Sequence, residues 1–471
     1  MCGSKTSSPG RKHAYAVVAV LAASLLLKLA ALALIYSIDP SRVLGGDSQS
    51  YENPALALLE TGSFAESPQT PQLPETKRTP GYPAFIAATY MIFGRSRFPV
   101  ILLQICLSTA TLGITYTIAR RLWNSRTALI AVVLLALDVA TFHSSQKLLT
   151  DTLFAFLIAV AVAAGVRLLL SDSPRKWSAL LLGGALALAT LVRPIGYYLV
   201  FPVLIGLLVY ATAARWNWKR VAVVLILTAG PSLVLVGGWQ FRNYRATGSF
   251  EFSHMRGHNL LWYRGAGIVA QRDHIALDEA RQRIEDSLPD MEGWTTAEQC
   301  DRYAREGMSL IRRHPLLLVR MQVRECADLL LAPAQVLLVR YLTGIELKAS
   351  PVGDALRLPP GQYVNKWVVA RPALFLAFVY EMVYLAVLYV GALYALWRVV
   401  RRERAHLVTH LFVWGVTLYF IILSSGPEAH SRFRVPFMPL LVVYAAMGLG
   451  RVLGGIRARW HQQAGGSCEA P

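Results

Sequence analysis

The chain contains few charged residues, and acidic residues are especially scarce. Asp, Glu, Lys and Arg make up 16% of its 471 residues, and 28 acidic residues are set against 47 basic ones, giving a formal net charge of +19. Soluble globular domains contain about 25% charged residues, whereas 55% of this chain is hydrophobic. This composition excludes a disordered chain and argues against an ordinary cytosolic enzyme.

Cysteine is also scarce, and its spacing excludes the usual cysteine motifs. The five cysteines (Cys2, Cys106, Cys300, Cys326 and Cys468) form no CxxC pair and have no histidine at ligand spacing. A zinc site or a redox motif is therefore not predicted. A disulfide between Cys300 and Cys326 is an alternative to two free thiols, if both lie outside the membrane.

Apolar runs of about 20 residues alternate with short basic clusters, which is typical of a polytopic membrane protein and not of a nucleic-acid-binding one. The run at 14–36 follows two basic residues and is too long for a signal-peptide core, so it predicts an uncleaved first span. Ten runs are long enough, or nearly so, to cross about 30 Å of hydrocarbon. They cover residues 14–36, 98–119, 127–143, 148–170, 177–193, 195–213, 220–239, 373–397, 406–425 and 435–453.

The basic clusters predict the orientation of these spans. Cytoplasmic loops of membrane proteins carry an excess of Lys and Arg, and a cytoplasmic N-terminus places a basic cluster in every inner segment. The clusters are Arg11/Lys12, Arg120/Arg121/Arg126, Arg175/Lys176, Arg215/Lys219/Arg220, Arg398/Arg401/Arg402/Arg404 and Arg451/Arg457/Arg459. An even number of spans then returns the C-terminus to the cytoplasm.

Two long segments, 37–98 and 240–372, are predicted to lie on the outer face. In the first, Tyr51–Glu60 and Pro83–Phe93 are apolar but short, which predicts helices at the membrane interface. In the second, the apolar spacing over 275–288 indicates a helix. The stretch 314–342 is interrupted by charged residues and a proline, so it is predicted to pack at the outer interface, with an eleventh span as the alternative.

The predicted fold is an all-α polytopic membrane bundle with interfacial helices in its outer segments. Four regions follow from this topology: a transmembrane module at 1–239, an outer segment at 240–372, C-terminal transmembrane helices at 373–453 and a cytoplasmic tail at 454–471.

Polar residues with unusual placement all fall at the predicted outer face. An acid, Asp47, follows the first span, and cations follow later loops and span ends, as a negatively charged lipid phosphate would require. The candidates are Asp47, Tyr51, Lys77, Arg78, Tyr82, Asp151, Arg193, Arg242, Asn243, Arg432 and Arg434.

The order of these motifs resembles the GT-C superfamily of integral-membrane glycosyltransferases. It is most similar to the bacterial branch of the dolichyl-phosphate-mannose protein mannosyltransferases (glycosyltransferase family 39), a family that includes the lipid A aminoarabinose transferases. The resemblance rests on the ordered series Asp47 to Tyr51, Gly62-Ser63-Phe64, Arg78-Thr79-Pro80-Gly81-Tyr82-Pro83, Thr150-Asp151-Thr152, Leu191-Val192-Arg193-Pro194, Arg242-Asn243-Tyr244, Thr247-Gly248-Ser249-Phe250, Gly257-His258-Asn259, His314-Pro315 and Arg432-Phe433-Arg434-Val435-Pro436.

The resemblance implies a sugar donor linked to a polyprenyl phosphate and used at the outer face of a bacterial plasma membrane. It also implies that Asp47 lies near the reacting centre. Many members carry Asp-Glu at this site, whereas this chain has Asp47-Ser48. Neither outer segment contains Asp-X-Asp, so no cofactor is firmly implied, and a divalent metal ion stays an open alternative. The expected partners are the donor, the bilayer and an acceptor that is a lipid, a glycan or a protein.

The residue chemistry suits this reaction. An acceptor hydroxyl needs a base, and Asp47 is the candidate. The departing phosphate gains negative charge, which Arg78, Arg193 and Arg432, supported by Lys77 and Arg434, can stabilise. Substrate positioning is assigned to Tyr51, Tyr82, Asp151, Arg242 and Asn243. Direct attack opposite the phosphate would invert the anomeric centre.

Several alternatives remain open at the level of sequence. Asp47 can be a helix N-cap, Arg193 a snorkelling residue, and Lys147 with Asp151 an i, i+4 ion pair. His143 is interpreted as structural. A lipid or solute transporter with an outward cationic cavity is the rival function, and a scaffold for another membrane enzyme is a third.

Overall fold

The computed structural model of the protein describes residues 9–171, 175–345, 358–402, 406–427 and 429–465. Within these ranges the regular structure is helical, and the one pairing of extended backbone is an isolated bridge between Ala65 and Pro74. The prediction of an all-α protein is confirmed. Arg404 and the last part of the predicted tail lie outside the described residues.

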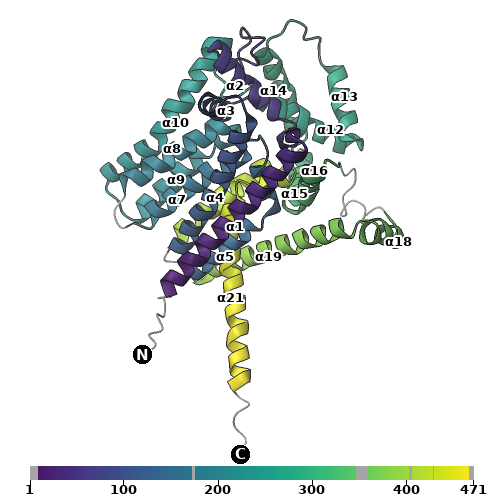
Figure 1. Ribbon diagram of the computed structural model, residues 1–471. Helices are drawn as coiled ribbons and strands as arrows, with labels where there is room; N and C mark the ends of the chain where they lie inside the picture. Colours follow the sequence, from purple (N-terminus) through teal and green to yellow (C-terminus); the bar gives the residue numbers. More distant parts are fainter. Residues whose placement is uncertain (1–8, 172–174, 346–357, 403–405, 428, 466–471) are drawn as a thin grey trace, which may run out of the picture.

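The main body is a bundle of apolar helices (Figure 1). Its core brings together the N-terminal half of the chain and the C-terminal helices α19 to α21. The bundle helices are α1 (Pro9–Ile38), α4 (Arg97–Leu122), α5 (Ser125–Ala136), α6 (Val139–Ser145), α7 (Asp151–Leu169), α8 (Lys176–Val192), α9 (Val200–Ala213), α10 (Trp218–Thr247), α19 (Pro372–Arg402), α20 (Leu407–Ser424) and α21 (Met438–Gly465).

Each of the ten predicted spans coincides with apolar helix. Seven helices in the described ranges are long and apolar enough to cross a membrane, and up to nine spans result if two bent helix pairs each count as one. α8 and the apolar part of α21 (Met438–Gly454) are shorter. The prediction of a polytopic membrane bundle is confirmed, with seven to nine candidate spans against about ten expected.

The predicted span at 127–143 is not a straight helix. α5 and α6 meet at an angle of 62°. Asp138 lies at the break, and its carboxylate accepts a hydrogen bond of 2.7 Å from the backbone N–H of Thr141, capping α6. A capping carboxylate starts a new helix because it satisfies an N–H that has no partner within the helix.

The stretch predicted to pack at the outer interface, 314–342, forms α15 (Pro315–Leu331) and α16 (Gln335–Thr343). The two helices are bent by 53° around Pro333, yet together they are long and apolar enough to span. Glu381 of α19 accepts hydrogen bonds from the N–H groups of Ala334 and Gln335, at 2.6 and 2.8 Å. These contacts satisfy the free N-terminus of α16 inside the protein.

Most outer helices pack on one end of the bundle, whereas α18 and η4 lie beside the first residues of α19, away from that end (Figure 1). α2 and α3 form where short helices were predicted, and α13 lies within the predicted 275–288 stretch. Helices α11 to α14, with the π-helical turn η3, enclose a small core of their own around Leu261, Val269 and Ile284. The outer helices are α2 (Ser48–Thr61), α3 (Gly81–Phe93), α11 (Met255–His258), η3 (Asn259–Gly265), α12 (Ala266–Asp273), α13 (Leu277–Ser287), α14 (Thr296–Arg313), α18 (Pro360–Tyr363) and η4 (Val364–Val369).

The proposed disulfide alternative does not form. Cys300 and Cys326 are both free thiols. Cys300 is buried in α14, whereas the Cys326 sulfur lies 2.9 Å from the Ser425 hydroxyl at the end of α20.

Candidate active site

The turn after α1 places Asp47 at the end of the bundle that the outer segments cover. The short helix η1 (Pro40–Val43) and a Leu-Gly-Gly turn lead to Asp47, which directly precedes α2. Its carboxylate makes no capping bond to α2. The neighbouring Ser48 hydroxyl accepts a hydrogen bond from Gly45 N–H (2.7 Å) and donates one to the Leu148 carbonyl (2.8 Å). Ser48 thus ties the turn to the start of α7 and leaves the Asp47 carboxylate free for other contacts.

Asp47 instead binds two arginines from distant parts of the chain. Its Oδ1 lies 3.1 Å from Nη2 of Arg78, in the first outer segment. Its Oδ2 lies 2.8 Å from Nη2 of Arg432, in the short helix η6 (Ser431–Arg434) between α20 and α21. Asp47 occupies the N-cap position of α2, but its side chain makes no capping bond and is held by guanidinium groups.

Arg78 is oriented by its backbone and by two tyrosines. The Glu75 carboxylate accepts a hydrogen bond of 2.8 Å from the backbone N–H of Arg78. The guanidinium donates to the Tyr51 hydroxyl at 3.1 Å and lies 4.6 Å from the centroid of the Tyr51 ring. Tyr51 packs edge-on against the buried Tyr82, whose hydroxyl donates to Gln104. These contacts restrict Arg78 to the side of the site next to Asp47.

A second carboxylate, Asp151, lies behind the first. It is the first residue of α7, and it forms an ion pair with Arg193, which follows α8. Its Oδ2 is also 4.0 Å from Nε of Arg432. The Phe433 ring lies 5.4 Å from the Arg193 guanidinium and 5.2 Å from that of Arg432.

Together these five side chains form what we call the Asp47 cluster: Asp47, Arg78, Asp151, Arg193 and Arg432. Three cations and two carboxylates leave one net positive charge. The Asp47 side chain is 36% exposed, whereas that of Asp151 is 1% exposed. One carboxylate can therefore reach a substrate, and the other neutralises buried guanidinium charge. A pair of carboxylates in such different environments can take different roles.

The electrostatics of the Asp47 cluster favour the ionised form of Asp47. Partial burial raises the pKa of Asp47, but the hydrogen bond and charge of Arg432, together with those of Arg78, outweigh burial and hold it below its usual range. Burial lowers the pKa of Arg432, but the charges of Asp151 and Asp47 outweigh burial and raise it. Asp47 is a carboxylate at neutral pH and can still accept a proton through its remaining lone pairs.

Six predicted site residues lie outside the Asp47 cluster: Tyr51 and Tyr82, described above with Arg78, and Lys77, Arg242, Asn243 and Arg434. Arg242 donates to the carbonyls of Glu75 and Phe64, and Asn243 donates to those of Glu251 and Phe252, so both fasten α10 to neighbouring segments. They position the outer segments and do not line the cluster.

The structure separates Arg434 from the predicted phosphate ligands, whereas Lys77, next to Arg78 in the chain, stays a predicted ligand. Lys77 acts electrostatically on His258 and Cys300 of the second outer segment. Arg434 is fully buried, donates to the carbonyls of Leu329, Leu330 and Ala332, and binds Glu381 at 3.0 Å. Because its side chain is fully buried and both of its terminal nitrogens are bonded inside the protein, Arg434 cannot reach a phosphate at the Asp47 cluster.

The alternative i, i+4 pair between Lys147 and Asp151 is also absent. The Lys147 ammonium donates to the carbonyls of Arg42 and Leu44, at 2.6 and 3.1 Å, while Asp151 binds Arg193. Lys147 thereby holds the turn that leads to Asp47.

His430 adjoins the Asp47 cluster and had no predicted role. Its ring stacks on Phe433 at 4.6 Å between centroids, and its buried Nδ1 has no hydrogen-bond partner in the described ranges. Burial and the charge of Arg432 lower the pKa of His430 to about 4, so the ring is neutral at pH 7. The sequence signal was its position two residues before Arg432. Within the described residues, no group of three His, Cys, Asp or Glu side chains is placed to hold a metal ion.

With this geometry established, comparison with known proteins supports the resemblance. Residues 77–239 match the family model of dolichyl-phosphate-mannose-protein mannosyltransferases. This range contains Arg78, Asp151 and Arg193 of the Asp47 cluster, but not Asp47 or Arg432. A search of curated protein sequences found no significant match.

Two solved structures from an archaeon share the fold of this chain, and a third structure, from another organism, is less similar. The apo oligosaccharyltransferase of Archaeoglobus fulgidus has 14% identity and a TM-score of 0.53, with 97% of this chain and 52% of that chain covered. AglB of the same organism, in complex with an inhibitory peptide and a dolichol-phosphate, has 14% identity and a TM-score of 0.52 with the same coverage. ArnT from Cupriavidus metallidurans bound to undecaprenyl phosphate has 14% identity and a TM-score of 0.41, with 94% and 78% covered.

The chain therefore spans about half the length of the oligosaccharyltransferases it matches. The predicted resemblance to the GT-C superfamily is confirmed, by the family model over 77–239 and by the fold over nearly the whole chain.

Proposed function

We propose that this protein is a glycosyltransferase that moves a sugar from a polyprenyl-phosphate donor to an acceptor at the outer membrane face. The observation that carries the proposal is the Asp47 cluster, in which a solvent-accessible carboxylate lies between two guanidinium groups that can bind phosphate. The family match over 77–239 and the dolichol-phosphate bound by the archaeal AglB support this donor class. Neither comparison favours the transporter alternative.

Asp47 is proposed to act as the general base. As the acceptor hydroxyl attacks the anomeric carbon, Asp47 takes its proton and the bond from that carbon to the phosphate oxygen breaks. Attack opposite the phosphate inverts the anomeric centre. Arg78 and Arg432 are proposed to stabilise the negative charge that develops on the departing phosphate, since guanidinium groups bind phosphate oxygens in pairs.

Donor binding is coupled to the strength of this base. Arg78 and Arg432 lower the pKa of Asp47 by donating to its two oxygens. A donor phosphate competes for the same N–H groups, and each contact it takes weakens the hold on Asp47. The carboxylate then becomes a stronger base when the donor is in place.

The orientation is also proposed. The Asp47 cluster lies where α1 and α8 end and where α7 begins, and the opposite ends of these helices adjoin the basic clusters of the chain. The positive-inside rule then places the Asp47 cluster outside and both termini in the cytoplasm, in a bacterial plasma membrane. Cysteine substituted for the exposed Gln72 should be labelled in intact cells, and cysteine substituted for the exposed Lys219 only after permeabilisation. The reverse pattern would contradict the orientation.

The decisive experiment incubates the purified full-length protein with polyprenyl-phosphate sugars of both hexosyl and pentosyl type. Candidate lipid, glycan and peptide acceptors are added in turn. We expect release of free polyprenyl phosphate together with a glycosylated acceptor for one combination. Movement of intact donor between leaflets without cleavage of the sugar–phosphate bond would favour the transporter instead.

A further inference from the structure

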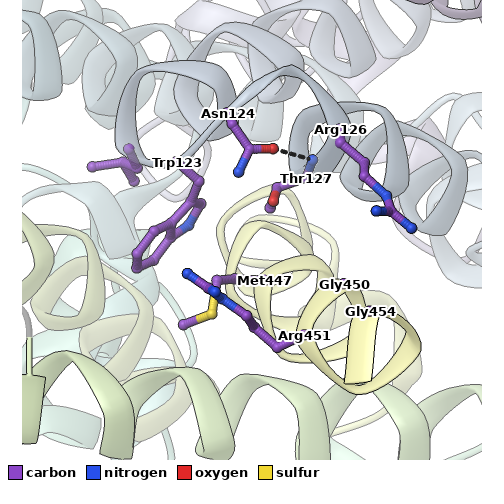
Figure 2. A pocket seen from close by; sticks show the side chains of 9 residues that line it. Trp123, Asn124, Arg126, Thr127, Met447, Gly450, Arg451 and Gly454 are labelled. Atoms are coloured by element: carbon purple, nitrogen blue, oxygen red, sulfur yellow. Dashed lines mark hydrogen bonds between the residues drawn. The ribbon is translucent and has the colours of Figure 1, made fainter. Parts of the chain in front are cut away.

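A cavity of about 700 Å³ opens at the end of the bundle opposite the Asp47 cluster. α4 begins beside the outer segment, where Arg97 binds Glu52 of α2, and ends at Leu122, so the turn after it lies at the far end. The cavity is bounded by this α4–α5 turn and by residues 447–454 in the middle of α21 (Figure 2). Its lining residues are Leu122, Trp123, Asn124, Arg126, Thr127, Met447, Gly450, Arg451 and Gly454.

The polar groups of this cavity are donors. Figure 2 shows the Arg451 side chain beside the Trp123 indole. Arg126 lies beyond Thr127, on the side away from that ring. Neither guanidinium has a hydrogen-bond or ion-pair partner among the described residues, and the Trp123 indole N–H is buried without one. The Asn124 side-chain oxygen is occupied by the Thr127 N–H at 2.9 Å, as the cap of α5, which leaves its amide N–H₂ available.

None of the described residues that line the cavity carries a carboxylate. Two cations, an indole N–H, an amide and the N-terminus of a twelve-residue helix line it, and all of them favour an anion. The fixed position of Trp123 adds to this, because its ring is stacked on His410 at 4.8 Å between centroids. The cavity size falls in the range of small-ligand sites.

The surroundings distinguish a lipid headgroup from a soluble anion. Val452 and Leu453 are 54% and 50% exposed beside Arg451, and Leu122 and Met447 form an apolar part of the lining. A headgroup bound between the arginines would leave its acyl chains against these side chains. Basic cavities between transmembrane helices on the cytoplasmic side are suited to anionic lipid headgroups.

We propose that the cavity between the α4–α5 turn and α21 binds the phosphodiester headgroup of an anionic phospholipid of the inner leaflet. The proposal rests on the orientation given above but not on the proposed catalysis. Arg126 and Arg451 hold the phosphate, and the Trp123 and Asn124 donors complete its coordination.

The test titrates the purified full-length protein with phosphatidylglycerol in detergent and counts bound lipid by native mass spectrometry. Phosphatidylcholine is the uncharged comparison. Each cation near a bound anionic lipid contributes roughly fivefold in affinity, so the double variant Arg126→Gln/Arg451→Gln should bind phosphatidylglycerol at least tenfold more weakly. The matched control, Lys219→Gln/Arg220→Gln, removes the same charge from exposed positions at the start of α10 and should bind like wild type.

A third variant separates shape from charge. A side chain at Gly454 would extend into open space, because a Cβ there meets no atom within 4 Å. Gly454→Leu should therefore fill the cavity and weaken phosphatidylglycerol binding without changing the charge. Equal binding of the two lipids, or equal loss in both double variants, would overturn the proposal. Displacement of the lipid by inorganic phosphate at similar concentration would overturn the lipid as ligand and assign a soluble anion.

Discussion

Arg432 and Arg434 lie two residues apart in η6, and the structure uses them in opposite ways. Arg434 is fully buried and is bound to three carbonyls and to Glu381. The Arg432 side chain is 19% exposed, contacts the accessible carboxylate of Asp47 and lies within 4.0 Å of Asp151. Both are arginine–carboxylate sites, but only one of them presents charged groups to solvent.

The difference separates a structural ion pair from a reactive one. In the Arg434–Glu381 pair, both partners also bind backbone groups: Arg434 donates to three carbonyls, and Glu381 satisfies the N-terminus of α16. In the Asp47 cluster, contacts between side chains dominate, and these can be exchanged for contacts to a ligand. We therefore expect substitutions at the first pair to change stability and substitutions at the Asp47 cluster to change activity.

The largest expected effect is on catalysis at Asp47. Asp47→Asn keeps the size of the side chain but removes the proton acceptor, and general-base catalysis contributes about 10²–10⁴-fold. Single-turnover sugar transfer should fall by that factor, while donor affinity changes little. The matched control is Asp39→Asn, which removes a carboxylate from the same loop outside the Asp47 cluster and should transfer sugar at the wild-type rate. Near-normal transfer by Asp47→Asn would remove Asp47 as the base.

The next effect is on stability at Arg434. Arg434→Met leaves the Glu381 carboxylate buried without its cation, which costs about 3–5 kcal/mol of unfolding free energy in buried pairs. Thermal unfolding in detergent should show a large loss for this variant and a much smaller one for Arg432→Met. If the two variants were equally destabilised, the contrast between the two arginines would be lost.

A smaller effect is expected on donor binding at Arg78. The Arg78 side chain is 20% exposed, and Arg432 still holds Asp47 when Arg78 is removed. Arg78→Ala should therefore fold normally and bind the donor roughly 30-fold more weakly, since loss of one partner of a desolvated charge pair costs about 2–5 kcal/mol. Arg95→Ala removes an exposed arginine paired with Glu60 and serves as the control. Unchanged donor affinity in Arg78→Ala would exclude Arg78 as a phosphate ligand.

Much of the fold was predictable because the bilayer requires long apolar runs and the loops carry the charge. What could not be predicted depends on single residues. Asp138 reads as one polar residue in an apolar run, and nothing in the sequence shows that it caps a new helix and bends the chain. Lys147 and Asp151 are four residues apart, which is the spacing of an ion pair on one helix. However, α7 begins only at Asp151, so Lys147 lies before the helix and the pair does not form.

The Asp47 cluster was predictable only in part, because the sequence shows residue types and positions but not which distant side chains meet. Asp47, Arg78, Arg193 and Arg432 were identified by type and by position at the outer face, and the structure brings them together. Arg434 was grouped with them because it is also a cation at the predicted outer face, against the usual charge bias. Its different surroundings come from carbonyls at the end of α15 and from Glu381 of α19, which are distant in sequence.

The smallest expected effect is a shift in pH dependence, and it tests the coupling between Asp47 and its arginines. The pKa of Asp47 is lowered mainly because Arg432 and Arg78 outweigh burial. Transfer should therefore persist as the pH falls past the ordinary carboxyl range and be lost only when the lowered pKa is reached. Arg78→Ala removes one of these interactions and should move the acidic limb of the single-turnover profile to higher pH, whereas Arg95→Ala should leave it in place. Sugar transfer measured between pH 3 and 8 at donor concentrations far below saturation, where the profile reports the donor-free protein, tests this. An acidic limb in Arg78→Ala that coincides with wild type would show that Arg78 does not control the protonation of Asp47.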